Sequence, residues 1–256
     1  MLWKDKTAVI TGGAKRIGRQ ICLRLAREGI NILFTYRSSE EEARDTERSI
    51  KELGVKAAAV KVELSNLEDC ERLLSQAKEL FNSIDILVNN ASEFPRTLLA
   101  TLSDNSLDFK AKLEQQTGIH MRAPLFLGMR LGLEMKARGW GRIINITDSA
   151  VASGSAYKNY ALYLATKYGL HGITQVLAVE LAPEVTVNSI APGFIRAPDH
   201  YSAATIEKLR DKVPLQREGG ESEIAEDVWF LIQSEFKTGA AIVTDGGVAA
   251  HTESSG

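Results

Sequence analysis

The chain has 256 residues, with 31 Lys or Arg and 33 Asp or Glu, so its formal net charge is −2. This balance excludes a nucleic-acid binder driven by bulk positive charge. No apolar run approaches the roughly 18 residues that a membrane-spanning helix needs, and residues 1–6 contain no signal-peptide stretch. The two cysteines and four scattered histidines show no metal-ligand spacing. We therefore expect a soluble, cytoplasmic, metal-free protein without membrane or nucleic-acid partners.

Short β-rich runs alternate with longer amphipathic stretches along the chain. The predicted strands are residues 7–11, 32–36, 56–62, 85–88, 142–146, 185–190 and 240–243. The predicted helices are residues 17–29, 40–53, 67–81, 115–137, 160–181 and 221–233. This alternation predicts parallel βαβ units with right-handed crossovers in a single α/β domain over residues 1–256. Residues 192–220 are left without a clear element, and we interpret this long segment as a substrate lid.

The first predicted strand runs into the segment TGGAKRIG, residues 11–18, where a helix begins. Glycines let the backbone approach a phosphate closely, and a helix N-terminus offers free N–H groups and a positive dipole. The spacing is not the usual G-x-G-x-x-G, so an ordinary βα turn that uses glycines is the alternative. If the turn binds a cofactor, its contacts are Gly12, Lys15, Arg16 and Ile17.

The end of the second predicted strand distinguishes NAD from NADP. An NAD enzyme needs a carboxylate there to bind the ribose diol. The chain instead has Tyr36, Arg37 and Ser38, and an arginine beside hydroxyl groups suits a 2′-phosphate. A surface arginine next to an N-cap serine is the alternative. We predict that these three residues bind NADP(H).

Of the six tyrosines, only Tyr163 has a lysine four residues later, Lys167. Residues i and i+4 lie on one helix face, and a nearby ammonium group lowers the pKa of a phenol. The pair is therefore a candidate proton donor with its activating charge. A packed aromatic beside a solvated charge is the alternative.

Polar segments follow three other predicted strands. These are NNAS at residues 89–92, NITDS at residues 145–149, and the Pro192-Gly193 pair. Ligands of open parallel sheets bind at the carboxyl edge of the strands, where these segments meet.

Taken together, the motifs resemble those of the short-chain dehydrogenase/reductase family. TGGAKRIG, NNAS, Tyr163-x-x-x-Lys167, NSIAPG and TGAAIVTDGG occur in that family's order. The resemblance implies a Rossmann-type doubly wound parallel sheet of seven strands with helices on both faces. It also implies hydride transfer between a nicotinamide and a small-molecule substrate, in a homotetramer or dimer.

The resemblance assigns roles to single residues. Tyr163 would be the general acid, and Lys167 would hold the nicotinamide ribose and lower the pKa of Tyr163. Asn89 would support the cofactor. The further cofactor contacts that the resemblance implies are Glu63, Leu64, Asn90, Ala91, Pro192 and Gly193.

Three positions depart from the family pattern. Arg16 replaces the usual third glycine of the turn, Asp148 aligns with the catalytic serine, and His120 aligns with a supporting asparagine. Such a set, together with the Arg37-Ser38 pair and an aromatic after NNAS, resembles the pteridine reductases and dihydromonapterin reductases.

That narrower resemblance implies a substrate site. Phe94 would stack on a pterin ring opposite the nicotinamide, and Ser92 would hydrogen-bond near both. Arg16 would reach the cofactor phosphates and the substrate. Asp148 and Tyr163 would complete the set of residues that touch the substrate.

The chemistry of Asp148 gives an independent argument. Reducing a ketone builds negative charge on oxygen, which an ionised carboxylate opposes. Reducing a C=N bond needs a proton on nitrogen, and a carboxylate favours the iminium cation. Asp148 therefore favours an imine-type substrate such as a dihydropterin.

Two alternatives remain open. Asp148 precedes Tyr163 by 15 residues, two more than is common, and Ser149 precedes it by 14. If Ser149 takes the serine role, the protein would be an NADPH-dependent reductase of carbonyls such as 3-oxoacyl thioesters or sugars. A non-catalytic NADPH-sensing regulator is the second alternative, against which the intact Tyr163–Lys167 pair argues.

Overall fold

The computed structural model describes residues 3–98, 106–197 and 201–250. These ranges contain seven strands: β1 Thr7–Ile10, β2 Asn31–Tyr36, β3 Ala57–Lys61, β4 Ile86–Asn89, β5 Gly141–Ile146, β6 Val185–Pro192 and β7 Ala241–Thr244. They form one sheet in the order β3-β2-β1-β4-β5-β6-β7, and every neighbouring pair is parallel. The predicted doubly wound sheet is confirmed.

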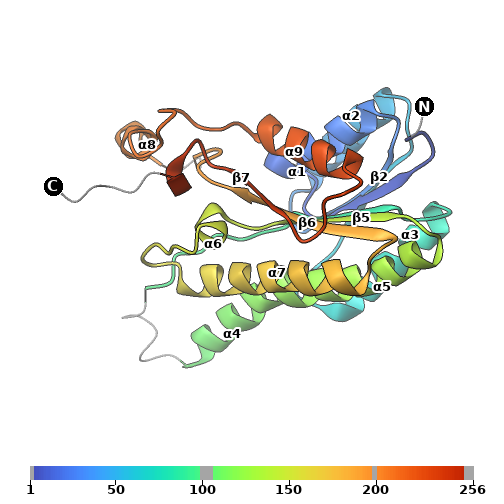
Figure 1. The fold of residues 1–256 in the computed structure, drawn as a ribbon, viewed down its shortest axis with the longest axis horizontal. Coiled ribbons are helices and arrows are strands. Elements are labelled where there is room, and N and C mark those ends of the chain that lie inside the picture. Colours follow the sequence, from blue (N-terminus) through green and yellow to red (C-terminus); the bar gives the residue numbers. More distant parts are fainter. Residues whose placement is uncertain (1–2, 99–105, 198–200, 251–256) are drawn as a thin grey trace.

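Helices cover both faces of this sheet (Figure 1). Their bounds are α1 Arg16–Arg27, α2 Glu40–Glu52, α3 Leu67–Leu80, α4 Ser106–Thr117, α5 Ala123–Ala137, α6 Ser149–Ala152, α7 Ala161–Glu180, α8 Ala203–Arg210 and α9 Glu221–Gln233. Figure 1 shows α1, α2 and α9 on one face, and α3, α4, α5 and α7 on the other. The central strands β1, β4 and β5 are buried along their whole length, because helices cover both sides of a parallel sheet.

Two apolar layers hold the sheet between its helices. Ile10 and Ile21 belong to the layer beneath α1 and α9, and Leu73, Leu127 and Leu177 belong to the layer beneath α3, α5 and α7. This packing fixes the carboxyl ends of the strands, where the polar segments predicted from the sequence lie.

Two helical segments differ from the sequence prediction. The predicted helix 115–137 is divided into α4, which begins at Ser106, a π-helical turn Gly118–Arg122, and α5. The segment 192–220 contains α8. Residues 108–114 of α4 are mostly exposed, and α8 has no buried residue. Helices without an apolar stripe give no periodic signal.

None of the helices in the described ranges is long and apolar enough to cross a membrane. Within the same ranges, no group of three His, Cys, Asp or Glu side chains is placed to hold a metal ion.

Candidate active site

A groove of about 470 Å³ runs along the carboxyl ends of β1, β2 and β4. Most of the predicted cofactor contacts line it: Gly12, Lys15, Arg16, Ile17, Tyr36, Arg37, Ser38, Glu63, Leu64, Asn90 and Ala91. Ser92 and Phe94, which we predicted to contact the substrate, line the same groove. The fold therefore brings together segments as far apart in the sequence as Gly12 and Phe94.

The turn after β1 has the geometry of a phosphate cradle. Gly12 has a φ of +67°, and a Cβ on Gly18 would lie 2.0 Å from the Gly12 carbonyl oxygen. Only glycine fits both positions. The N-terminus of α1 has no side-chain cap and no acid in its first turn, so its N–H groups and positive dipole suit an anion.

The loop after β4 holds this turn in place. The Asn90 side chain donates hydrogen bonds to the carbonyl oxygens of Thr11 and Gly12, at 2.9 and 3.0 Å. Asn89, which we expected to support the cofactor, is instead buried and donates to Asn145 Oδ1 at 2.8 Å. Strand residues alternate in direction, so the second asparagine of NNAS faces the turn and the first faces the core.

Arg16 has a φ of 51°. This left-handed conformation costs a non-glycine residue about 1–2 kcal/mol, which explains why the family places glycine here. Strain of this kind is typical of functional sites.

An ion pair that the sequence did not predict lies at the mouth of the groove. The Arg37 guanidinium group donates to the carboxylate of Glu93. Glu93 directly follows Ser92 in the loop after β4. Because both side chains remain partly exposed, an anion that binds Arg37 competes with Glu93 for the guanidinium group.

Asp148 lies at the end of β5 and accepts three hydrogen bonds. Its Oδ1 accepts from the Ala150 N–H at 2.9 Å, which caps α6. Its Oδ2 accepts from the hydroxyl groups of Tyr163 and Tyr157, both at 2.9 Å. Ser149 is the first residue of α6, and in the described part of the chain no hydrogen bond joins its side chain to Tyr163. The phenol therefore faces the carboxylate.

The environment of Tyr163 corrects one prediction. We expected Lys167 to lower the pKa of Tyr163, but the pKa of this phenol is raised, first by burial and then by the charge of Asp148. The Lys167 ammonium group lies 5.6 Å from the centre of the Tyr163 ring and donates to the Ile146 carbonyl oxygen at 2.7 Å. Tyr163 thus stays protonated at neutral pH and can donate.

Lys167 is itself in an unusual environment for a lysine. It is 1% exposed, and burial lowers the pKa of its ammonium group to about 8, against which the charge of Asp148 acts. A buried cation of this kind, beside a phenol and a carboxylate, is typical of catalytic sites.

His120 lies beside the same phenol, in the π-helical turn Gly118–Arg122. Its ring meets the Tyr163 ring edge to face, with centres 5.5 Å apart. A Cβ on Gly118 would lie 2.7 Å from the Cα of Ser65, so glycine allows the turn to approach the loop after β3. π-helical turns are frequent at functional sites.

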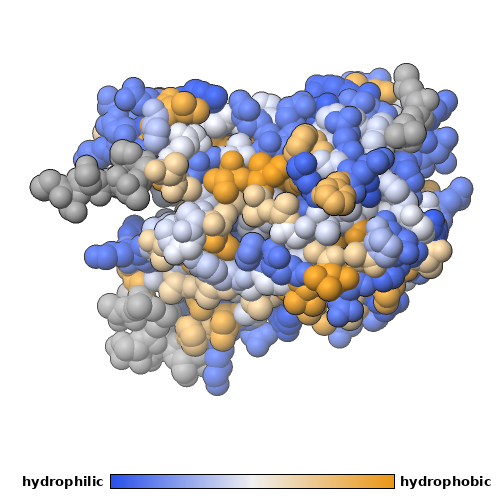
Figure 2. Space-filling view, in the orientation of Figure 1, coloured by the Kyte–Doolittle hydropathy of each residue, from blue (hydrophilic) through white to orange (hydrophobic). Residues whose placement is uncertain are grey.

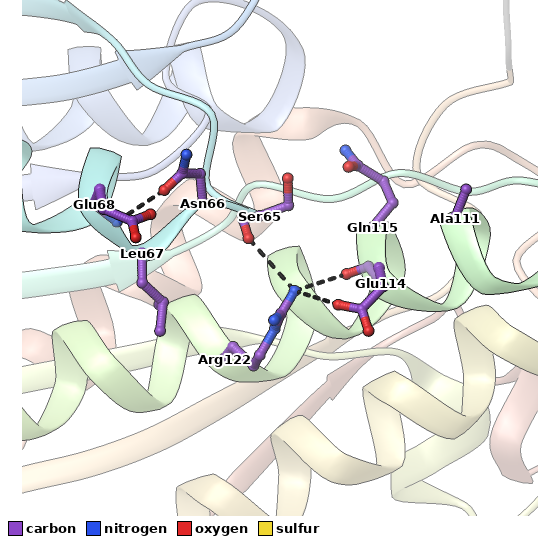
Figure 3. Close-up of a pocket in the computed structure, with 8 residues that line it drawn as sticks. All are labelled: Ser65, Asn66, Leu67, Glu68, Ala111, Glu114, Gln115 and Arg122. Atoms are coloured by element: carbon purple, nitrogen blue, oxygen red, sulfur yellow. Dashed lines mark hydrogen bonds and ion pairs between the residues drawn. The ribbon is translucent and has the colours of Figure 1, made fainter.

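Arg122, the last residue of that turn, joins it by hydrogen bonds to two neighbouring segments (Figure 3). Its guanidinium group donates to the carbonyl oxygens of Ser65 and Glu114, at 3.4 and 3.2 Å. The pocket drawn in Figure 3 contains none of the predicted site residues. Through Arg122, the loop after β3 and the end of α4 are tied to the π-helical turn that contains His120.

Phe94 lies directly against Tyr163, the candidate proton donor. Its ring is stacked on Tyr160 at 4.1 Å and meets the Tyr163 ring edge to face at 4.7 Å. Phe94 is nevertheless 48% exposed, which leaves aromatic surface for a planar ligand.

Pro192 and Gly193 are predicted cofactor contacts that do not line this groove. The Gly193 N–H donates to the Thr244 carbonyl oxygen at 3.0 Å. A Cβ on Gly193 would lie 2.5 Å from the Cβ of Asp245. The glycine therefore lets the ends of β6 and β7 come together.

Comparison with known proteins shows the family of the chain. A family model described as "Enoyl-(Acyl carrier protein) reductase" matches residues 12–249. The chain is 31% identical over 249 residues to the 3-oxoacyl-[acyl-carrier-protein] reductase FabG of Staphylococcus epidermidis. The alignment covers 95% of this chain and 99% of that protein.

Solved structures agree at the level of the whole fold. The FolM alternative dihydrofolate reductase 1 of Brucella canis, complexed with NADP, has a TM-score of 0.87 and 28% identity, over 100% of this chain and 98% of that one. Its counterpart from Brucella suis, also with NADP, has a TM-score of 0.88 and 28% identity, over 98% of each chain. With the sheet, the glycine turn and the tyrosine–lysine pair in place, the chain belongs to the short-chain dehydrogenase/reductase family of oxidoreductases.

Proposed function

We propose that this protein is an NADPH-dependent reductase of a pteridine-like C=N bond. The observation that carries the proposal is the hydrogen bond from the Tyr163 hydroxyl to the Asp148 carboxylate. A carboxylate at this place supports protonation of nitrogen and opposes the oxyanion of a ketone. The FolM structures named above support the same substrate class.

NADP(H) is the cofactor that the groove fits. The cradle formed by Gly12, Gly18 and the N-terminus of α1 suits a pyrophosphate. Arg37 and Ser38 stand at the end of β2, where an NAD enzyme carries an acid. Bound NADPH supplies a hydride to the substrate.

The protein's own contribution is a proton and its orientation. Tyr163, kept protonated by burial, gives the proton to the ring nitrogen of the substrate. Asp148 accepts from this phenol and orients it, and its charge favours the protonated substrate. Lys167 holds the positive charge that stabilises the phenolate left behind.

Phe94, Ser92 and Arg16 form the substrate side of the groove. Phe94 provides a stacking surface next to the proton donor, and Arg16, which belongs to the phosphate turn, would also contact the substrate. The segment 192–220, which we interpret as a substrate lid, contains α8, and its residues 198–200 lie outside the described ranges.

A carbonyl reductase is the second candidate, since the chain is 31% identical to a 3-oxoacyl-[acyl-carrier-protein] reductase. Purified protein is assayed for NADPH oxidation with dihydrobiopterin or dihydromonapterin and, separately, with an acetoacetyl thioester. Turnover of the dihydropterin alone is expected. Turnover of the thioester alone would give the serine role to Ser149, and cofactor binding without any turnover would favour a sensor.

Replacing Glu93 by Gln is expected to tighten NADPH binding. The substitution removes the carboxylate that competes for Arg37. Exposed ion pairs are worth about 0.2–1 kcal/mol, so the gain is about 1.5- to 5-fold in Kd. Arg37→Gln, which removes a charged phosphate ligand, is expected to weaken NADPH binding about 10- to 100-fold. Fluorescence titration with NADPH measures both changes.

Titration with NADH provides the control, because NADH has no 2′-phosphate. Its Kd should change little in either variant. Equal changes for both nucleotides would show that Arg37 does not read the 2′-phosphate.

The assembly is a homotetramer or dimer built on the outer faces of α5 and α7. Large apolar side chains are exposed there: Leu125, Met129, Leu133, Val176 and Val179, the last 79% exposed. Figure 2 shows apolar patches over α7 and β7 on the face that it presents. Exposed apolar faces of this kind mark protein interfaces. Sedimentation analysis measures the oligomeric state directly.

The proposed location of the protein is the cytoplasm, which holds a pool of NADPH.

A further inference from the structure

Three side chains from distant parts of the chain form a series of hydrogen bonds behind the groove. Thr166 Oγ1 on α7 lies 2.8 Å from His120 Nδ1, and His120 Nε2 lies 2.9 Å from Ser92 Oγ. Thr166 is 2% exposed and His120 is 1% exposed. Ser92 is exposed and lines the groove.

The position of each proton follows from the contacts of Thr166. Its hydroxyl oxygen lies 2.8 Å from the Tyr163 carbonyl oxygen. A carbonyl oxygen has no proton, so the Thr166 hydroxyl is the donor. A hydroxyl has a single proton to give. Thr166 therefore accepts from His120, and the ring proton of His120 is on Nδ1.

The imidazole ring is neutral in this environment. Burial and the nearby charge of Lys167 lower the pKa of His120 to about 2. A neutral imidazole with a proton on Nδ1 has a bare Nε2. The short contact to Ser92 is consequently a hydrogen bond that the Ser92 hydroxyl donates.

We propose that Thr166 and His120 fix Ser92 as a hydrogen-bond acceptor toward the ligand in the groove. With its one proton committed to His120, Ser92 presents only lone pairs, so the group that meets it is a hydrogen-bond donor. A dihydropterin ring offers amide and amino N–H groups, whereas the reacting end of a 3-oxoacyl thioester offers carbonyl acceptors. The ligand class rests on the function proposed above, but the proton arrangement does not.

The arrangement of protons is tested by ¹⁵N NMR of histidine-labelled protein at neutral pH. The His120 signals are assigned by their loss in His120→Asn, which introduces the residue that the family has at this position. The expected result is a neutral ring with its proton on Nδ1. A ring protonated on Nε2, or a doubly protonated ring, would overturn the proposal.

The matched variants are Thr166→Val and Thr166→Ser. Valine keeps the shape and removes the acceptor, so His120 is expected to move its proton to Nε2 and donate to Ser92. Serine keeps the hydroxyl and should restore the wild-type spectrum. An unchanged tautomer in Thr166→Val would show that Thr166 does not set it.

Steady-state kinetics distinguishes a loss of ligand binding, which raises KM, from a general disturbance of the active site, which also lowers kcat. Thr166→Val and Ser92→Ala are expected to raise KM for the dihydropterin about 3- to 10-fold, the effect of one hydrogen bond, with little change in kcat. Thr166→Ser should return KM to near its original value. A fall in kcat at constant KM would contradict the acceptor role. If NMR shows the predicted tautomer but the protein binds no dihydropterin, the proposed substrate is refuted and the Thr166–His120 arrangement is supported.

Discussion

Replacing Asp148 by Ser is expected to lower kcat for reduction of a dihydropterin about 100-fold or more. The carboxylate oxygen that accepts from Tyr163 is lost, and with it the negative charge that favours a protonated ring nitrogen. The variant keeps the fold, because serine caps a helix as well as aspartate does and Asp148 is the cap of α6. Single-turnover kinetics with dihydropterin and NADPH measures the loss.

Asp148→Asn is the matched comparison, because it keeps the size of the side chain and removes only the charge. It is expected to lose nearly as much activity as Asp148→Ser. If serine also confers reduction of an acetoacetyl thioester, the residue at this position selects between C=N and C=O substrates. Dihydropterin turnover that survives the serine substitution intact would refute the role of the carboxylate.

Replacing Tyr163 by Phe is expected to lower kcat about 10²- to 10⁴-fold, the usual contribution of a general acid. The substitution removes the hydroxyl that donates to Asp148 and that we propose protonates the substrate. Binding of NADPH should persist, since the cradle residues of the groove are unchanged. Stopped-flow kinetics gives kcat, and fluorescence titration gives the Kd of NADPH.

Tyr157→Phe is an internal control for that experiment. Tyr157 donates to the same carboxylate oxygen over the same 2.9 Å, and its pKa is likewise raised by burial and by Asp148. As a positioning residue, its loss should lower kcat less than tenfold, the value of one hydrogen bond. Equal losses in the two variants would mean that Tyr163 only orients Asp148.

Several features of the site depend on contacts that no sequence pattern announces. Glu93 and Arg37 are 56 positions apart, and His120 and Thr166 are 46 apart. Neither pair belongs to a motif, and each of the four residues has a plain local explanation as a surface charge or a helix residue. The first pair forms only when the ends of β2 and β4 lie side by side, and the second only when the π-helical turn packs against α7.

The direction of the Tyr163 pKa shift is a further example. Spacing placed Lys167 on the same helix face as Tyr163, which is confirmed by the 5.6 Å separation. Spacing contains no information about burial or about the partner that faces the hydroxyl. Both raise the pKa of Tyr163, so the expectation of a lowered pKa was wrong.

The sequence by itself determined the fold class, the alternation of strands and helices in parallel βαβ units, and the family. Apolar periodicity and the order of motifs can be read directly along the chain, without knowledge of the contacts between distant segments. It also indicated many of the residues that line the groove, such as Arg37 and Asn90, because they directly follow predicted strands, but it wrongly placed Pro192 and Gly193 there. Only the tertiary structure decided that Asp148 rather than Ser149 faces Tyr163, that Asn90 rather than Asn89 holds the turn, and that His120 touches Ser92. These depend on the angle at which a strand ends and on which groups become buried together, and both are set by packing between distant segments.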